Sequence, residues 1–117
     1  YIQQIAEIEK NFNAAQFEQG KADLNEEAKF VLHDLAKVLK AHTDIKLTIK
    51  GHTSAEGDAT FNQKLSEARA KAAVDFLVER EGVAVEQLSY AGMGSSELKN
   101  ADNPMAPENR RTEFIIE

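Results

Sequence analysis

Residues 51–70 read GHTSAEGDATFNQKLSEARA, and the elements on either side of this stretch decide the fold. The segment before it, residues 44–52, alternates aliphatic with polar side chains, which predicts a strand with one covered face. Inside the stretch, Thr60 followed three positions later by Gln63 forms a capping-box signal for a helix. We therefore predict a strand, a loop, and then a helix that runs to about residue 81.

The segments outside this central unit add a second helix and three strands. Residues 25–41 carry apolar side chains every three or four positions, which predicts an amphipathic helix. Short strands are expected at residues 12–17 and 88–92, and a closing strand is expected at residues 111–117. Gly, Ser, Asn and Pro are frequent in residues 92–109, which indicates a long irregular loop before the last strand.

The predicted order of elements indicates the fold class. Strand, helix, strand, helix, strand, strand corresponds to an α+β fold, a two-layer α/β sandwich of β-α-β-α-β-β order with the helices on one face of a mixed sheet. A chain of 117 residues is long enough to bury one core without disulfides or a metal. We expect residues 11–117 to form this domain and residues 1–10 to be a lead-in segment, either a short helix or extended chain.

Composition argues against several classes of function. The formal net charge of −6 disfavours nucleic acids and anionic membrane surfaces, which both attract clustered Lys and Arg. Cysteine is absent, which excludes disulfides, thiol nucleophiles and cysteine metal sites. No run reaches the roughly 18 apolar residues of a membrane helix. Because the sequence starts at Tyr1 without a signal-like segment, we expect a targeting signal and any membrane anchor to lie upstream.

Three further motifs accompany the central stretch: a Gly-Val pair at residues 82–83, Gly-Met-Gly at 92–94 and Asn-Arg-Arg at 109–111. In this order they resemble the OmpA-like C-terminal domain family, whose signature is Gly-His-Thr-Asp, then Gly, Asn and Leu-Ser-x-x-Arg-Ala. The resemblance covers residues 11–117 and includes Phe17, Ala22 and Leu24, which are similar to the first strand and turn of the family.

The resemblance implies a periplasmic domain of an outer-membrane-associated protein in a Gram-negative bacterium. Related family members are the peptidoglycan-associated lipoprotein and the wall-anchoring domain of the flagellar stator. The implied function is non-covalent binding of peptidoglycan through the diaminopimelate residue of its stem peptide, which anchors an outer-membrane protein or lipoprotein to the cell wall. No catalytic residue, cofactor or metal is expected.

Arg69 is the main candidate for binding the ligand. Diaminopimelate has a free amino-acid end, and the planar fork of Arg meets a carboxylate in two parallel hydrogen bonds. Arg69 lies seven positions after Asn62, so both side chains are expected on one stripe of the predicted helix. None of the residues three and four positions from Arg69 is acidic, so its own helix offers it no ion pair. The neighbouring stripe is predicted to be apolar: Phe61, Leu65, Ala68, Ala72 and Phe76.

The resemblance implies that further residues line the site: Thr53, Ser54, Leu65, Arg110 and Arg111. Asn62 either orients a ligand carboxylate or ties the preceding loop to the helix. Arg110 and Arg111 are adjacent at the start of a strand, so their side chains point to opposite faces. One of the two is expected to line the pocket and the other to pair with a structural carboxylate, and the sequence leaves open which does which.

Ser54 departs from the family signature. The family has Asp at this position, and that Asp takes the ammonium group of the ligand. A neutral hydroxyl forms a weaker bond, so the change is expected to cost about 1 to 3 kcal/mol, or one to two decades in affinity. Glu56 and Asp58 lie in the same loop and are candidates to compensate, although Asp58 also suits the positive end of the following helix. We expect wall binding in a weakened form or with an altered ligand preference.

Other classes of function remain as alternatives. The first is a protein-interaction module that forms a homodimer and has weakened or lost wall binding. A small acyl-phosphate hydrolase shares this size and layered fold, but the three histidines lack the spacing of metal ligands. A ferredoxin-like RNA binder fits the order of elements, but the negative charge and the lack of an aromatic-rich strand argue against it.

Overall fold

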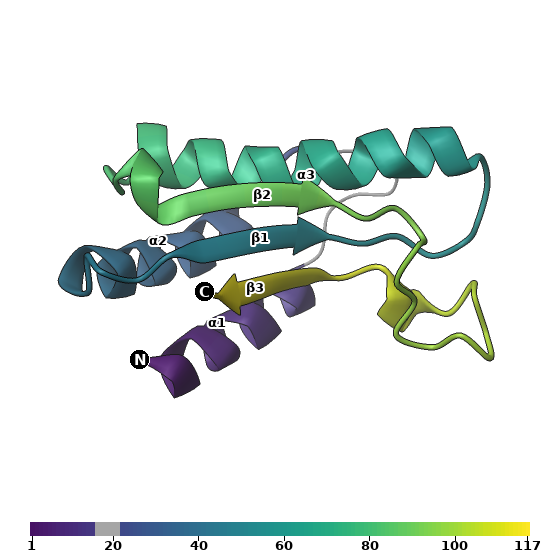
Figure 1. The fold of residues 1–117 in the computed structure, drawn as a ribbon, viewed down its shortest axis with the longest axis horizontal. Coiled ribbons are helices and arrows are strands. Elements are labelled where there is room, and N and C mark those ends of the chain that lie inside the picture. Colours follow the sequence, from purple (N-terminus) through teal and green to yellow (C-terminus); the bar gives the residue numbers. More distant parts are fainter. Residues whose placement is uncertain (16–21) are drawn as a thin grey trace.

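The computed structural model describes residues 1–15 and 22–117. Its three helices and three strands are shown in Figure 1. The elements are α1 (Ile2–Ala15), α2 (Glu26–Ala41), β1 (Leu47–Gly51), α3 (Ala59–Glu79), β2 (Leu88–Gly92) and β3 (Thr112–Ile116), with short 3-10 helices at Val85–Gln87 and Pro107–Asn109. None of the described helices is both long enough and apolar enough to cross a membrane.

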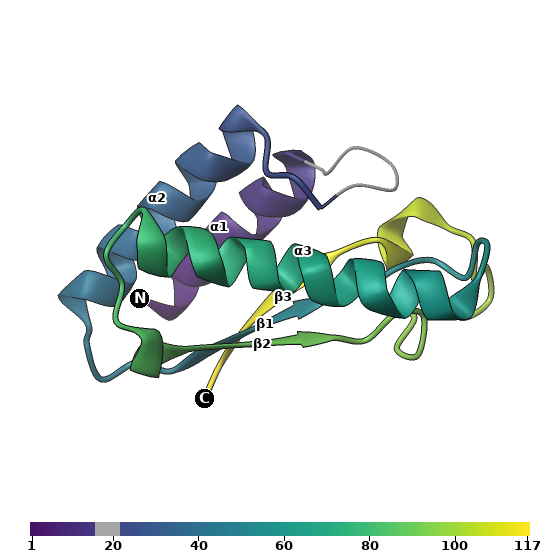
Figure 2. The same cartoon turned by 90° about the horizontal axis from the view of Figure 1, so that it is seen from above.

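The three strands form one mixed sheet with the order β2-β1-β3. The central strand β1 pairs parallel with β2 and antiparallel with β3. Helix α3 connects the two parallel strands, and all three helices cover the same face of the sheet (Figure 2). This arrangement confirms the predicted α+β class, in which helices pack on one face of a mixed sheet.

The N-terminal segment differs from the predicted strand. Residues 12–15 belong to α1, and the remaining positions of the expected strand, 16 and 17, lie outside the described residues. The reason is helical spacing: Ile5, Ile8 and Phe12 are all buried on one face of α1. The ring of Phe12 packs against Phe114 of β3 with 5.4 Å between centroids. Residues 2–10 are therefore helical and pack into the common core.

Helix α2 agrees with the prediction. Asn25 is its N-cap, and the side-chain oxygen of Asn25 accepts a 2.8 Å hydrogen bond from the backbone N–H of Ala28. The apolar stripe is buried in the core through Ala28, Leu32, Leu35, Ala36 and Leu39. Burial of these side chains fixes α2 against α1 and α3 in the common core.

Helix α3 turns a different face to the sheet from the one predicted. The expected stripe is not the buried one, because the side chain of Phe61 is 51% exposed and Ala68 is also exposed. The buried face is instead formed by small or polar residues together with two aliphatic ones: Asn62, Ser66, Ala70, Ala73, Val74 and Leu77. Small residues are needed because the backbone of α3 lies directly on Gly51 and Gly92, where an added Cβ would lie 2.4 Å from Ser66 O and 2.3 Å from Glu67 Cγ.

Candidate functional site

A groove of about 630 Å³ opens beyond the C-terminal end of β1. It lies between the loop that follows β1, the first half of α3 and the segment that leads into β3. Residues from all three segments line it. The nine site residues expected from the sequence are all among them: Thr53, Ser54, Glu56, Asp58, Asn62, Leu65, Arg69, Arg110 and Arg111.

Asn62 holds the loop against the helix. Its side-chain amide donates hydrogen bonds to the backbone carbonyls of Glu56 at 2.7 Å and Ser54 at 3.4 Å. On the other side, the N–H of Thr53 donates to Gly94 O, and the N–H of Ala55 donates to Pro104 O. The loop is thus fixed on both sides. Of the two roles expected for Asn62, the structure shows the one in which its side chain ties the preceding loop to the helix.

Two short polar side chains, Thr53 and Ser54, are among the buried residues that line the groove. Thr53 and Ser54 are only 4% and 3% exposed, although both line the groove. The hydroxyl oxygen of Thr53 has no hydrogen-bond partner among the described residues. A buried hydroxyl without a partner costs free energy, and a ligand group that reaches it recovers the missing bond.

The cationic side of the groove contains Arg69 and Arg110. Burial is the main cause that lowers the pKa of Arg69, and the positive charge of Arg110 lowers this pKa further. The two guanidinium groups are therefore close enough to repel each other. Arg110 is exposed, whereas Arg69 is partly buried at the edge of the core.

Arg111 also lines the groove, but one side of its guanidinium, Nη2, is engaged elsewhere. Its Nη2 donates a 3.1 Å hydrogen bond to the backbone carbonyl of Glu97 and lies 3.7 Å from the carboxylate of Glu113. Arg111 thus has the structural carboxylate that was expected for one of the two adjacent arginines, and Arg110 is the one near Arg69.

The two acidic residues that were candidates to replace the missing Asp differ in their surroundings. The carboxylate of Asp58 is the N-cap of α3 and accepts from the N–H groups of Thr60 at 3.4 Å and Phe61 at 3.3 Å. The predicted N-cap, Thr60, is wrong by two residues. Asp58 caps the helix instead, and its carboxylate also complements the helix dipole. Glu56 is exposed beside the groove, so its carboxylate is the more available of the two.

Replacing Asp58 by Ala is expected to lower the free energy of unfolding by about 1 kcal/mol, because two backbone N–H groups of α3 lose their acceptor. Urea unfolding of the variant checks this value. The control is Glu56→Ala, which removes an exposed acid from the same loop and is expected to leave stability within about 0.5 kcal/mol of the unchanged protein. Equal stabilities of the two variants would contradict the capping role.

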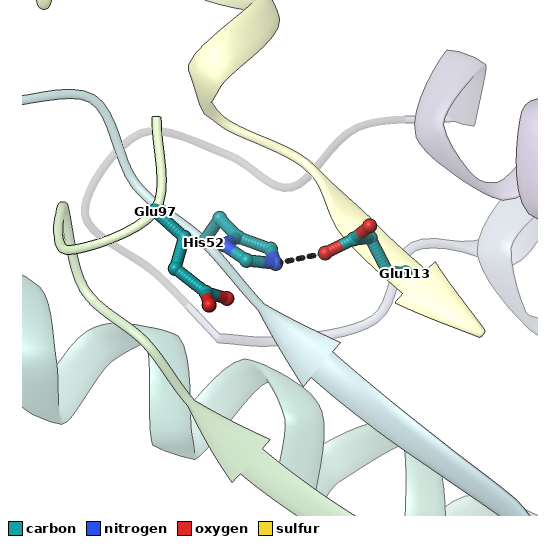
Figure 3. Close-up of side chains that lie close together, drawn as sticks. All are labelled: His52, Glu97 and Glu113. Atoms are coloured by element: carbon teal, nitrogen blue, oxygen red, sulfur yellow. Dashed lines mark hydrogen bonds and ion pairs between the residues drawn. The ribbon is translucent and has the colours of Figure 1, made fainter. Parts of the chain in front are cut away.

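A cluster that the sequence analysis missed lies next to the groove. The imidazole of His52 meets the carboxylate of Glu113 from β3, and the carboxylate of Glu97 lies nearby (Figure 3). One potential ligand atom from each of the three residues falls within a 4.8 Å span, so the set resembles a metal site. Two cations already face the carboxylates at 3.7 Å, Lys50 at Glu97 and Arg111 at Glu113, and they compete with any added ion.

Comparison with known proteins agrees with the fold and the motifs. The model of the OmpA family matches residues 16–112. Outer membrane porin F of Pseudomonas aeruginosa is 34% identical over 116 residues, which are 97% of this chain and 33% of the porin. The peptidoglycan-binding protein ArfA of Mycobacterium tuberculosis is 38% identical over 88 residues, which are 74% of this chain and 27% of ArfA. This chain therefore spans about a third or less of the length of these two relatives.

A solved structure gives the same result. The OmpA-like domain of FopA1 from Francisella tularensis superposes with a TM-score of 0.75 and 27% identity, over 87% of this chain and 69% of that chain. Because the family model matches most of the sequence and the fold agrees, the chain belongs to the OmpA family.

Proposed function

We propose that the domain binds peptidoglycan non-covalently in this groove and thereby anchors an outer-membrane protein or lipoprotein to the cell wall. The observation that carries the proposal is the convergence of Arg69 and Arg110 on a groove that also contains the buried polar side chains of Thr53 and Ser54. Among the relatives, ArfA is named as a peptidoglycan-binding protein and porin F as an outer-membrane protein. The proposed location is the periplasm of a Gram-negative bacterium, with the membrane anchor in another part of the protein.

The proposed ligand group is the free carboxylate of diaminopimelate in the stem peptide. A carboxylate between Arg69 and Arg110 forms charge-assisted hydrogen bonds and relieves the repulsion between the two guanidinium groups. Binding then gains from both effects, whereas a neutral ligand gains from neither. Leu65, which lines the same wall, offers apolar contact to the stem of the ligand.

The ammonium group of the ligand meets a neutral surface at Ser54. The buried hydroxyl of Thr53 and the exposed carboxylate of Glu56 are the acceptors that we propose for it. A hydrogen bond to a neutral oxygen is weaker than one to a carboxylate. We therefore expect the carboxylate of diaminopimelate to contribute more to the free energy of binding than its ammonium group. The proposed role is binding only, with no chemical step.

Isothermal calorimetry with diaminopimelate and sedimentation with purified peptidoglycan test the proposal. The unchanged domain is expected to bind both, and Ser54→Asp is expected to bind diaminopimelate about ten-fold more tightly, because it adds a charge opposite the ammonium. Glu56→Gln is expected to weaken binding by a few-fold. Thr43→Asp, which adds the same charge in the exposed turn between α2 and β1, is the matched control and should leave the affinity unchanged.

No binding by the unchanged domain, and none gained by Ser54→Asp, would contradict the proposal. In that case analytical ultracentrifugation distinguishes the alternative. A dimer whose population rises with protein concentration would support an interaction module that has lost wall binding.

A further inference from the structure

The cluster next to the groove contains groups that line the groove and groups that do not. His52 and Arg111 are lining residues, whereas Glu97 and Glu113 are not among the residues that line it. Figure 3 shows His52 between the two carboxylates, with its ring directed toward Glu113. Glu97 and Glu113 are connected to the groove through their contacts with His52 and Arg111.

We propose that Glu113 and His52 are positioning residues: they hold Arg111 in place and thereby direct its neighbour Arg110 into the groove beside Arg69. This inference rests on the proposed function, because it concerns the same binding site.

Arg111 is held through both its backbone and its side chain. Its backbone carbonyl accepts a 2.8 Å hydrogen bond from the N–H of His52. Its guanidinium donates to Glu97 O and lies 3.7 Å from the carboxylate that also contacts the His52 ring. One carboxylate, that of Glu113, thus faces both the imidazole and the guanidinium.

The orientation of Arg111 determines that of Arg110. The backbone of Arg110 is extended, with φ −85° and ψ 90°, and successive side chains of an extended chain point in opposite directions. While Arg111 points to Glu113, Arg110 points away from it, which agrees with its electrostatic effect on Arg69. Release of Arg111 removes the constraint that keeps these two adjacent side chains apart.

The protonation state of His52 links this geometry to pH. The charged groups facing the ring are Arg111, Glu113 and Glu97, with Lys50 beyond Glu97. Burial and Arg111 lower the pKa of His52 by more than Glu113 and Glu97 raise it. The neutral ring donates its Nε2 proton to Glu113, and its Nδ1 has no partner among the described residues. A second proton at Nδ1 is therefore a buried donor without an acceptor, next to a guanidinium.

The direction of the pH effect follows from the lowered pKa. In the closed form of this segment Glu113 holds Arg111, and in the opened form Arg111 is released. Above pH 6.5, the ordinary pKa of histidine, the imidazole of His52 is neutral in both forms, and the closed form keeps its full stability. Below 6.5 the opened form takes up a proton more readily than the closed form, so acid favours opening. Diaminopimelate keeps its charges across this range, so loss of affinity in acid reports on the protein.

Calorimetry with a diaminopimelate-containing stem peptide at pH 7.5 and 5.5 tests the inference. The unchanged domain is expected to bind several-fold more weakly at the lower pH. Glu113→Gln is expected to bind about ten-fold more weakly at pH 7.5, because a neutral amide holds Arg111 less strongly. His52→Gln is expected to show little dependence on pH. The matched control is Glu86→Gln, the same change at an exposed residue before β2, which should behave as the unchanged domain.

A readout without ligand separates this inference from the proposed function. The Nε–Hε signals of Arg110 and Arg111 in NMR spectra are expected to shift together as His52 titrates, and both are expected to move in Glu113→Gln. Glu97→Gln, which alters an exposed carboxylate, serves as the milder second variant if Glu113→Gln does not fold. Arginine signals that stay unchanged in these variants would overturn the inference, and so would equal affinities of a folded Glu113→Gln and the unchanged domain. Absence of binding by the unchanged domain would instead contradict the proposed function.

Discussion

Replacement of Arg69 by Ala is expected to weaken binding of diaminopimelate by about 100-fold or more. Removing one partner of a partly buried, hydrogen-bonded charge pair typically costs 2 to 5 kcal/mol, and each 1.4 kcal/mol is a factor of ten. Arg69 is the more buried of the two cations near each other in the groove, so its charge interacts with a ligand carboxylate in the less polar surroundings. In the Ala variant only Arg110 remains of the two guanidinium groups proposed to bind the ligand carboxylate.

Two further variants sharpen this test. Arg69→Lys keeps the charge but loses the planar fork, so its affinity is expected to fall between those of the unchanged domain and the Ala variant. Lys71→Ala removes an exposed cation of the same helix, which pairs with Asp75 at 2.7 Å, and it should leave binding unchanged. Calorimetry gives the affinities, and thermal unfolding shows whether each variant is folded. Equal losses of affinity in folded Arg69→Ala and Lys71→Ala would show that binding depends on the total charge of the domain and not on Arg69 in the groove.

Local patterns in the sequence were sufficient for much of the fold. Helix α2 could be predicted because its apolar residues repeat with helical spacing and Asn25 caps its start. Strand β1 could be predicted because aliphatic and polar residues alternate in this segment, and the structure buries the aliphatic ones. The site residues could be grouped because the motifs around Ser54 and Arg69 match one family pattern, and the structure places them in one groove.

The errors came from places where local patterns fit two outcomes. In α1 the spacing of Ile5 and Ile8 fits a helix, but so short a segment is stable only through packing, here of Phe12 on Phe114. In α3 the larger apolar side chains such as Phe61 suggested the wrong buried face, because the first half of the helix lies directly on the glycines of the sheet. Neither packing partner is visible from the local sequence.

The His52 cluster could not be predicted for a different reason. His52 and Glu113 are 61 positions apart, and no periodic pattern connects them. They meet because β1 and β3 are antiparallel neighbours, so that the residue after Gly51 on one strand reaches the start of the other. A polar contact of this kind depends on strand register, which the sequence alone does not specify.

Replacement of Gly51 by Ala is expected to have the largest effect on stability. The added Cβ would lie 2.4 Å from the backbone oxygen of Ser66, and a backbone atom of a packed helix cannot rotate away as a side chain can. Overpacking of a core typically costs 1 to 3 kcal/mol. Because β1 and α3 must move apart here, we expect about 3 kcal/mol or more, which corresponds to a fall in melting temperature of about 10 °C or more.

Gly57→Ala is the matched control, because it adds the same methyl group at a glycine that has no close neighbouring atom. Gly57 has φ +76° but an added Cβ would meet nothing within 4 Å, so only backbone strain of about 1 to 2 kcal/mol is expected. In Gly51→Ala the displacement of α3 also moves Asn62 away from the loop that it holds, so binding should weaken together with stability. In Gly57→Ala that hydrogen bond to the loop remains. Equal melting temperatures of the two variants would show that α3 adjusts to the sheet more easily than its close packing indicates.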